Sequence, residues 1–133
     1  MTINLATNTM SIRYKEICEE NDILYRSNVD DTKRTTISRW RLSSIPIKVE
    51  TGRYKRPPIP RENRLCSICF IVEDEEHVLL RCPLYQSIRI NYSRIFDINT
   101  NVKSILNPKS EYDIIYHANF LQEIEKCYKK HMS

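Results

Sequence analysis

Residues 66–82 read CSICFIVEDEEHVLLRC, and this stretch decides how the rest of the chain is organised. Two residues separate the first two cysteines, seven more precede a histidine and four more precede a third cysteine, which gives the pattern C-x2-C-x7-H-x4-C. Three thiolates and one imidazole are a donor set of tetrahedral structural zinc sites. We therefore expect one structural Zn²⁺, bound by Cys66, Cys69, His77 and Cys82.

The spacing of the last two ligands sets a condition on the local helix. The segment EEHVLLRC is expected to be a short helix, and His77 and Cys82 lie five residues apart in it. Five residues exceed one α-helical turn. Both side chains can therefore face one ion only if the helix loosens or ends at Cys82. Pro83 follows, and it suits the first turn of a new helix.

Other uses of these cysteines remain open at this point. Cys66 and Cys69 could form a disulfide or a redox C-x-x-C pair, although no βαβ pattern surrounds them, which disfavours the redox interpretation. A catalytic zinc is disfavoured because protein groups fill all four positions and leave none for water. A Cys–His nucleophile is less favoured still.

Composition bounds the fold class. The chain has 133 residues, 41% of them hydrophobic and 29% charged, which fits one domain with a modest core that a metal ion could reinforce. One glycine and six prolines argue against a sheet with many tight turns. We therefore predict a mainly α protein, a small helical domain with a CCHC zinc knuckle and an extended, basic, proline-rich arm.

Location and membrane contact are judged from the absence of apolar runs. The N-terminus, MTINLATNTM, has no apolar signal region, and no run approaches the length of a membrane span. We expect an intracellular protein of the nucleus or cytoplasm with no membrane partner. Five cysteines in a reducing compartment fit metal binding better than disulfides.

Positive charge is concentrated directly before the cysteine cluster. Residues 33–64 carry ten basic side chains and two acidic ones, a net of +8, whereas the whole chain is +4 and the remainder is therefore −4. Such a block indicates a phosphate-binding surface.

Residues 45–64 are expected to form the arm. Pro46 favours an extended start, Thr51-Gly52 is expected to turn, and the prolines of 57–60 favour a polyproline-like path. A stiff arm with guanidinium groups suits a nucleic-acid backbone, and its tyrosine can stack on a base. A solvated linker on the domain surface is the open alternative. The expected nucleic-acid contacts are Arg53, Tyr54, Lys55, Arg56, Arg61 and Arg64.

Apolar spacing and capping signals predict the helices. We expect helices over 11–28, 32–44, 83–96 and 100–107, and from Ser110 to the C-terminus, with Asp30 or Asp31 capping the second. Trp40 is interpreted as a core anchor rather than a base-stacking platform. The segments are then 1–32 (leader and helix), 33–65 (helix and basic arm), 66–82 (knuckle) and 83–133 (C-terminal helices). His117 and Cys127 could pair on a second metal, but a core or surface role is favoured.

The stretch IKVETGRYKRPPIPRENRLCSICFIVEDEEHVLLRCPLYQSIR (47–89) carries a family resemblance. Its ETGRY-basic-proline lead, the arginine shortly before Cys-x-x-Cys, the acidic run before the histidine and the Cys-Pro-Leu-Tyr with a following arginine resemble the zinc-binding C-terminal segment of non-LTR retrotransposon reverse transcriptases. The resemblance covers roughly residues 35–96, and the helices beyond are more loosely similar.

The resemblance implies the same four zinc ligands and a role in holding RNA or DNA, with the polymerase body of a parent element as a further partner. The chain departs from the family because it is too short for a palm and shows no paired-aspartate motif. We therefore expect a nucleic-acid-binding fragment that is not an enzyme. The alternative is a protein-interaction module that docks through its C-terminal helix, along Ile114, Ala118 and Leu121, with a purely structural zinc.

Overall fold

The computed structural model describes residues 22–132, and across these residues the chain is mainly helical, as predicted. It contains no strand in this range, only an isolated antiparallel bridge between Leu65 and Val72. The helix expected over 11–28 lies mostly outside the described residues. Its described end, 22–28, forms a turn rather than a helix.

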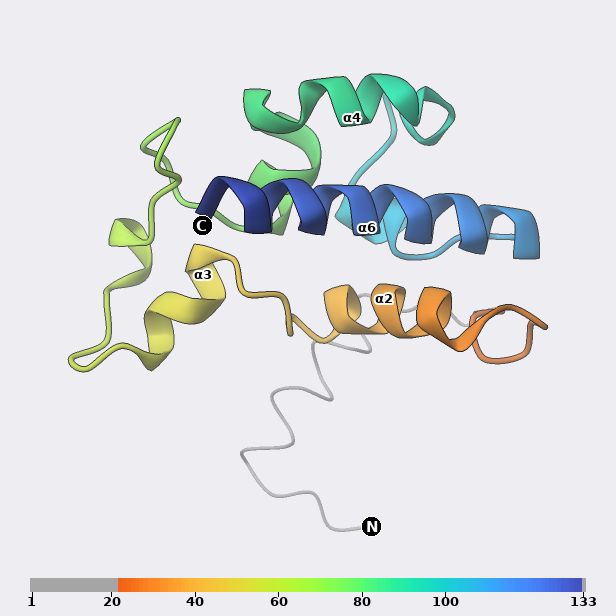
Figure 1. Ribbon diagram of the computed structural model, residues 1–133, viewed down its shortest axis with the longest axis horizontal. Helices are drawn as coiled ribbons and strands as arrows, with labels where there is room; N and C mark the ends of the chain where they lie inside the picture. Colours follow the sequence, from red (N-terminus) through yellow and green to blue (C-terminus); the bar gives the residue numbers. More distant parts are fainter. Residues whose placement is uncertain (1–21, 133) are drawn as a thin grey trace, which may run out of the picture.

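Two helices form the centre of the fold, α2 (Asp31–Arg41) and α6 (Glu111–Met132). Asp30 caps α2, since its Oδ1 accepts a hydrogen bond from the Thr32 N–H at 2.9 Å. Ser110 begins α6 in the same way, because its Oγ accepts from the Asp113 N–H at 3.1 Å. The two helices lie alongside each other, with α4 (Gln86–Asn91) on the other side of α6 (Figure 1).

The interface of these helices is an apolar core. The side chains at its centre are fully buried, namely Ile37, Trp40, Ile114, Ala118, Phe120, Leu121 and Ile124. Trp40 is thus a core residue, as predicted. Phe120 also packs edge-on against Phe96 and Tyr92, with ring centroids 5.4 and 5.7 Å away, which ties the segment after α4 to the same core.

One arginine of α2 is buried in this core rather than solvated. Arg41 forms a bidentate ion pair with Asp22 at 2.7 and 2.9 Å, and its Nε donates to the Leu106 carbonyl at 2.8 Å. A planar guanidinium can satisfy several acceptors at once, which is why an arginine is tolerated there. It joins the first described residue to the end of the short helix α5 (Val102–Ile105).

The segment after α2 differs from its prediction. Residues 45–50 were expected to be extended, with a turn at Thr51-Gly52. Ile47 is extended, but from Lys48 onward the expectation was wrong, because the chain forms the helix α3 (Lys48–Thr51), which continues into the 3₁₀ turn η1 (Gly52–Tyr54). Gly52 has an ordinary helical φ of −62°, so no left-handed turn requires it. It is required by close packing, because a Cβ there would lie 2.6 Å from Arg64 Cγ.

The remaining elements are short. The chain continues through the 3₁₀ turn η2 (Arg61–Asn63) and the π-helical turn η3 (His77–Arg81). The single helix expected over 83–96 is instead three pieces, η4 (Pro83–Tyr85), α4 and η5 (Ser93–Ile95). The helix expected over 100–107 is present as α5, and Asn101 and Ser104 form its capping box.

Candidate metal centre

The structure brings the four predicted ligands together. The Sγ atoms of Cys66, Cys69 and Cys82 and a ring nitrogen of His77 all lie within 4.8 Å of one another. Cys82 Sγ lies 3.9 Å from the Sγ of Cys66 and 3.9 Å from that of Cys69. Two thiolates about 2.3 Å from one ion at a tetrahedral angle are about 3.8 Å apart, whereas a disulfide measures about 2.05 Å. The geometry fits a shared cation, and Cys66, Cys69 and Cys82 are all free cysteines rather than disulfide-bonded.

His77 is the clearest sign that a ligand belongs here. The side chain is buried, and neither Nδ1 nor Nε2 has a hydrogen-bond partner among residues 22–132. Buried polar atoms without partners are costly and rare in folded proteins. Burial lowers the pKa of His77, against the charges of Asp74 and Glu73, so the ring is held in the neutral form that binds metals.

The first two cysteines lie on a tight turn between two short extended pieces. The turn is closed by the Cys66 N–H, which donates to the Ile71 carbonyl at 2.8 Å, and by the Phe70 N–H, which donates to the Cys66 carbonyl at 2.9 Å. The Ile68 N–H also points at Cys66 Sγ, 3.5 Å away. Phe70 has a φ of +59°, a left-handed conformation that costs a non-glycine residue about 1–2 kcal/mol. The turn therefore directs both sulfurs inward at the expense of backbone strain.

The other two ligands are aligned by the π-helical turn η3. The Cys82 N–H donates to the His77 carbonyl at 2.7 Å, five residues earlier, instead of four as in an α-helix. At the start of this turn the Asp74 Oδ1 accepts from the His77 N–H at 2.9 Å. The wider turn brings residues five apart to one face. The expectation that the helix must loosen for both ligands to converge is confirmed.

Arg89 holds the end of that turn, a role that the sequence analysis did not assign. It is buried, and it donates to the carbonyls of Val78 at 3.3 Å, Leu79 at 3.5 Å and Cys82. These carbonyls have lost the partners that a continuing helix would supply. Arg89 is therefore a positioning residue for Cys82. The signal available in the sequence was the arginine that follows the Cys-Pro pair.

Two of the thiols, those of Cys69 and Cys82, are hard to ionise without a cation. Burial, followed by the neighbouring Cys66 thiol, raises the pKa of Cys82 to about 12, although the Leu84 N–H opposes this. Desolvation likewise raises the pKa of Cys69. A divalent cation reverses such shifts, because it stabilises the thiolates that it binds. Four protein donors also leave no open position for water, so the site is suited to structure rather than catalysis.

Glu73 fastens the metal cluster to two helices. Its side chain is buried, and Oε1 accepts from the Lys48 N–H at 2.9 Å and from the Tyr128 hydroxyl at 2.7 Å. The Glu73 carbonyl also accepts from the Val49 N–H at 3.0 Å. This one residue joins the knuckle to α3 and α6. The sequence analysis treated it only as part of an acidic run.

The expected nucleic-acid contacts fall into two groups. Five of them belong to a surface that faces solvent: Tyr54 is 77% exposed, the Arg53 and Arg61 side chains are 50% and 61% exposed, and Lys55 and Arg56 are exposed as well. Arg53 lies 3.4 Å from a Glu50 oxygen, and Arg61 lies 3.4 Å from an Asp74 oxygen. Exposed pairs of this kind are weak and leave the guanidinium groups accessible.

Arg64 has a different place. It is partly buried, and it donates to the Ile59 carbonyl at 2.8 Å through Nε and to the Val49 carbonyl at 2.7 Å through Nη1. The Ile59 N–H in turn donates to the Gly52 carbonyl at 3.0 Å. Residues 52–59 are thus a loop closed at its base by Arg64, which we call the basic loop. The extended, stiff arm that was expected is folded back on itself.

The second candidate metal pair is not assembled in the described part of the chain. His117 Nδ1 lies 2.6 Å from the Ile105 carbonyl oxygen, and burial lowers the pKa of its ring. The cluster of Cys66, Cys69, His77 and Cys82 is the metal-ligating group found within residues 22–132, and neither His117 nor Cys127 belongs to it. His117 is partly buried, with its ring against the Ile105 carbonyl, which is compatible with the favoured core or surface role.

No family model, curated protein or solved structure matches this chain. Within residues 22–132, every helix is too short or too polar to cross a bilayer.

Proposed function

We propose that the chain is a non-catalytic nucleic-acid-binding domain whose Cys₃His centre holds one structural Zn²⁺. The observation that carries the proposal is the connection between the metal cluster and the basic loop. Arg64, which closes the base of the basic loop, lies two residues before Cys66 in the chain. The Glu73 N–H of the knuckle also donates to the Arg64 carbonyl at 2.9 Å. An ion that orders the knuckle would also order the base of the loop.

Zinc is the metal that fits these donors best. Three thiolates and one imidazole in a closed tetrahedral set are typical of structural zinc and disfavour magnesium or calcium, which prefer oxygen. The ion supplies charge that stabilises three neighbouring thiolates, and the buried imidazole of His77 gains the partner that it lacks within the protein.

Recognition is proposed to be mainly electrostatic. Arg53, Lys55 and Arg56 contact phosphates and Arg61 adds a weaker contact, while Tyr54 stacks on an unpaired base. Arg64 is assigned to holding the loop rather than to contacting phosphate, because two backbone carbonyls already occupy it. RNA or DNA is the proposed partner, and an intracellular location in the nucleus or cytoplasm suits both the thiols and the ligand.

The resemblance to the zinc-binding segment of retrotransposon reverse transcriptases supports this proposal, with the polymerase body of such an element as a further partner. The competing proposal, docking along Ile114, Ala118 and Leu121 of the last helix, lacks a surface. All three side chains are fully buried in the chain's own core.

The test measures binding of labelled single-stranded RNA, single-stranded DNA and duplex DNA at several salt concentrations. Charge reversal in Arg53→Glu/Arg56→Glu is expected to lower affinity roughly tenfold or more and to reduce the salt slope by about two on duplex DNA. Arg26→Glu/Lys103→Glu, with the same net charge but changes away from the loop, should retain binding. Tyr54→Ala should weaken single-strand binding by about 1–3 kcal/mol and spare duplex binding.

Two results would overturn the proposal. One is salt-dependent binding that Arg53→Glu/Arg56→Glu leaves unchanged, because the basic loop would then not be the contact surface. The other is native mass spectrometry of the purified chain that shows no bound zinc, before or after zinc addition.

A further inference from the structure

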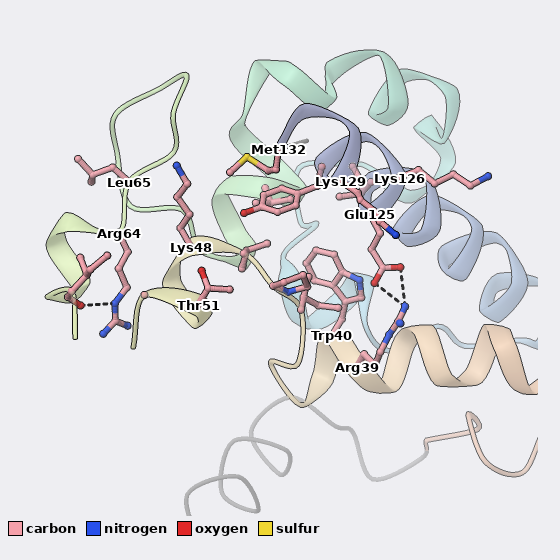
Figure 2. A pocket seen from close by; sticks show the side chains of 18 of the residues that line it. Arg39, Trp40, Lys48, Thr51, Arg64, Leu65, Glu125, Lys126, Lys129 and Met132 are labelled. Atoms are coloured by element: carbon pink, nitrogen blue, oxygen red, sulfur yellow. Dashed lines mark hydrogen bonds and ion pairs between the residues drawn. The ribbon is translucent and has the colours of Figure 1, made fainter. Parts of the chain in front are cut away.

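A groove of about 1120 Å³ runs between α2, α3 and the C-terminal end of α6 (Figure 2). Its floor is mostly apolar. Pro46, Ile59, Leu65 and Met132 are partly or fully exposed there, whereas Trp40, Ile47, Val78 and Ile124 line it as buried core residues. Pockets of about 300–1,000 Å³ already accommodate a drug-sized molecule. The groove can therefore hold several side chains of a protein ligand.

The rim of the groove is positively charged. Lys48 and Lys55 lie on one wall and Lys126 and Lys129 on the other, and none of the four forms an ion pair within residues 22–132. Glu125 is acidic, but Arg39 neutralises it through contacts of 2.8 and 2.9 Å (Figure 2). The groove thus combines an apolar floor with a cationic edge.

One buried polar atom of the floor has no partner. Trp40 is 0% exposed, and its Nε1 has no acceptor among the described residues. An unmade hydrogen bond of a buried donor is costly, but an indole that is closed to solvent cannot reach a ligand in the groove without a rearrangement of the core. The burial of the same ring also means that it presents no open face for stacking on a nucleobase.

We propose that this groove binds an amphipathic helical peptide of a protein partner, with an aliphatic face flanked by acidic side chains. The aliphatic face fills the floor, and the carboxylates pair with the rim lysines. Met132 lines one end and is 45% exposed, which provides an adaptable apolar contact. Helix-in-groove recognition uses such apolar anchors at i, i+3, i+4 and i+7. The site shares Lys55 and the base of the basic loop with the proposed nucleic-acid surface, but Arg53, Tyr54 and Arg56 do not line it.

The experiment selects ligands from a random peptide phage library on the full, zinc-loaded chain. The expected pool carries aliphatic residues at helical spacing with an excess of Asp and Glu. A selected peptide should bind Lys126→Glu/Lys129→Glu at least about tenfold more weakly, whereas Arg26→Glu/Lys103→Glu should bind it normally. The emission of Trp40, the single tryptophan of the chain, should shift on binding.

Several outcomes would overturn the proposal. They are an unenriched pool, an enriched pool that is basic or unpatterned, and binding that the Lys126→Glu/Lys129→Glu variant leaves unchanged. Displacement of the peptide by an oligonucleotide whose own affinity falls equally in that variant would assign the groove to nucleic acid. Peptide binding seen only after deletion of residues 1–21 would assign it to the chain's own N-terminus, and loss of self-association in the variant would assign it to a second copy.

The result is separable from the nucleic-acid proposal. Arg53→Glu/Arg56→Glu should lose oligonucleotide binding and retain peptide binding, because neither residue lines the groove. Failure of one proposal therefore leaves the other standing.

Discussion

The α2–α6 pair and the metal knuckle bury their residues by different means. In the helix pair, the buried set is mainly apolar, from Ile37 and Trp40 on one side to Leu121 and Ile124 on the other, and its one buried charge, Arg41, is paired with Asp22. In the knuckle region the buried set is rich in polar groups, including Glu73, Glu75, His77 and Arg89. Regular structure differs too, since α6 has 22 residues whereas the knuckle has one bridge and one π-helical turn.

The difference indicates where each half obtains its stability. Burial of apolar surface stabilises the helix pair without any ligand. The knuckle buries charged groups and the ring nitrogens of His77. Their burial opposes folding unless a bound ion and its thiolates compensate for the cost. The helix pair should therefore persist without metal, and the knuckle should not.

Metal removal gives the largest expected effect and tests this contrast directly. Chelation, or Cys82→Ser, should remove hydrogen-exchange protection from residues 64–82 while α2 and α6 keep theirs, because only the knuckle depends on the ion. Structural zinc contributes about 10–16 kcal/mol in isolated peptides, which is an upper bound here. The measurement is residue-resolved hydrogen exchange.

Cys127→Ser is the matched control, since Cys127 is a free cysteine on α6 outside the metal cluster. It should retain one bound zinc and normal protection. Uniform loss of protection across both halves on chelation would show that the two regions fold as one unit and would break the comparison.

The next largest effect is expected at Arg89, which lies between the two regions. Arg89→Met would leave the carbonyls of Val78, Leu79 and Cys82 without their buried donor, at a cost of about 2–4 kcal/mol. Zinc affinity should also fall about 10–100-fold, as for other groups that orient ligands. Urea unfolding measures the loss of stability, and chelator competition measures the loss of zinc affinity. Arg81→Met, at an exposed site of the same turn, should change neither, and an equal loss there would refute the positioning role.

A smaller loss is expected where the basic loop is clasped. Gly52→Ala would place a Cβ 2.6 Å from Arg64 Cγ and 2.7 Å from its Cδ, so the clasp must shift. Overpacking of this kind costs about 1–3 kcal/mol. Lys55→Ala, at an exposed site of the loop, should be close to neutral. Urea midpoints compare the two variants, and a neutral Gly52→Ala would mean that Arg64 moves aside freely.

Acid should weaken the helix pair through Asp22. Burial alone would raise the pKa of Asp22, but the hydrogen bond and charge of Arg41 and the Leu24 N–H together lower it below 3.8. The ionised pair therefore stabilises the fold above about pH 3.8, and this contribution is lost as the pH falls further through the lowered pKa. The stability difference between the wild type and Asp22→Asn should shrink below pH 3.8, as followed by Trp40 fluorescence in metal-free protein. A difference independent of pH would contradict this.

The smallest expected effect is a gain in stability. It compares one residue from each region, and the two residues have similar backbone strain. Phe70 in the knuckle and Ser43 after α2 have φ values of +59° and +55°. Phe70→Gly should relieve that strain and gain up to about 1 kcal/mol in the zinc-loaded protein. Ser43→Gly should gain less, because it also loses the 3.1 Å hydrogen bond from Ser43 Oγ to Glu75. Thermal midpoints rank the two, and the reverse order would be inconsistent with this account.

Local signals in the sequence predicted the parts of the fold that local interactions determine. The caps at Asp30 and Ser110, the core role of Trp40 and the four converging ligands follow from short-range spacing. The wider turn at His77 could also be anticipated, because two ligands five residues apart require it.

The parts that could not be predicted depend on distant partners. The helix α3 forms where Pro46 suggested an extended segment, and its end packs against Arg64, which also folds the expected arm into a loop. From the sequence alone, Arg89 and Glu73 look like ordinary surface charges. In the fold, Arg89 is surrounded by backbone carbonyls, and Glu73 by a backbone N–H and a tyrosine hydroxyl. Such roles arise from tertiary contacts, which no periodicity encodes.

Glu73 has one more consequence. One side-chain oxygen of Glu73 accepts hydrogen bonds from the Lys48 N–H on one side of the groove and from the Tyr128 hydroxyl on the other. The width of the groove at that point is thus fixed by the span of one carboxylate oxygen and two hydrogen bonds. Neither side can move outward alone without breaking a hydrogen bond to this buried oxygen, so the groove keeps its width as the helices around it fluctuate.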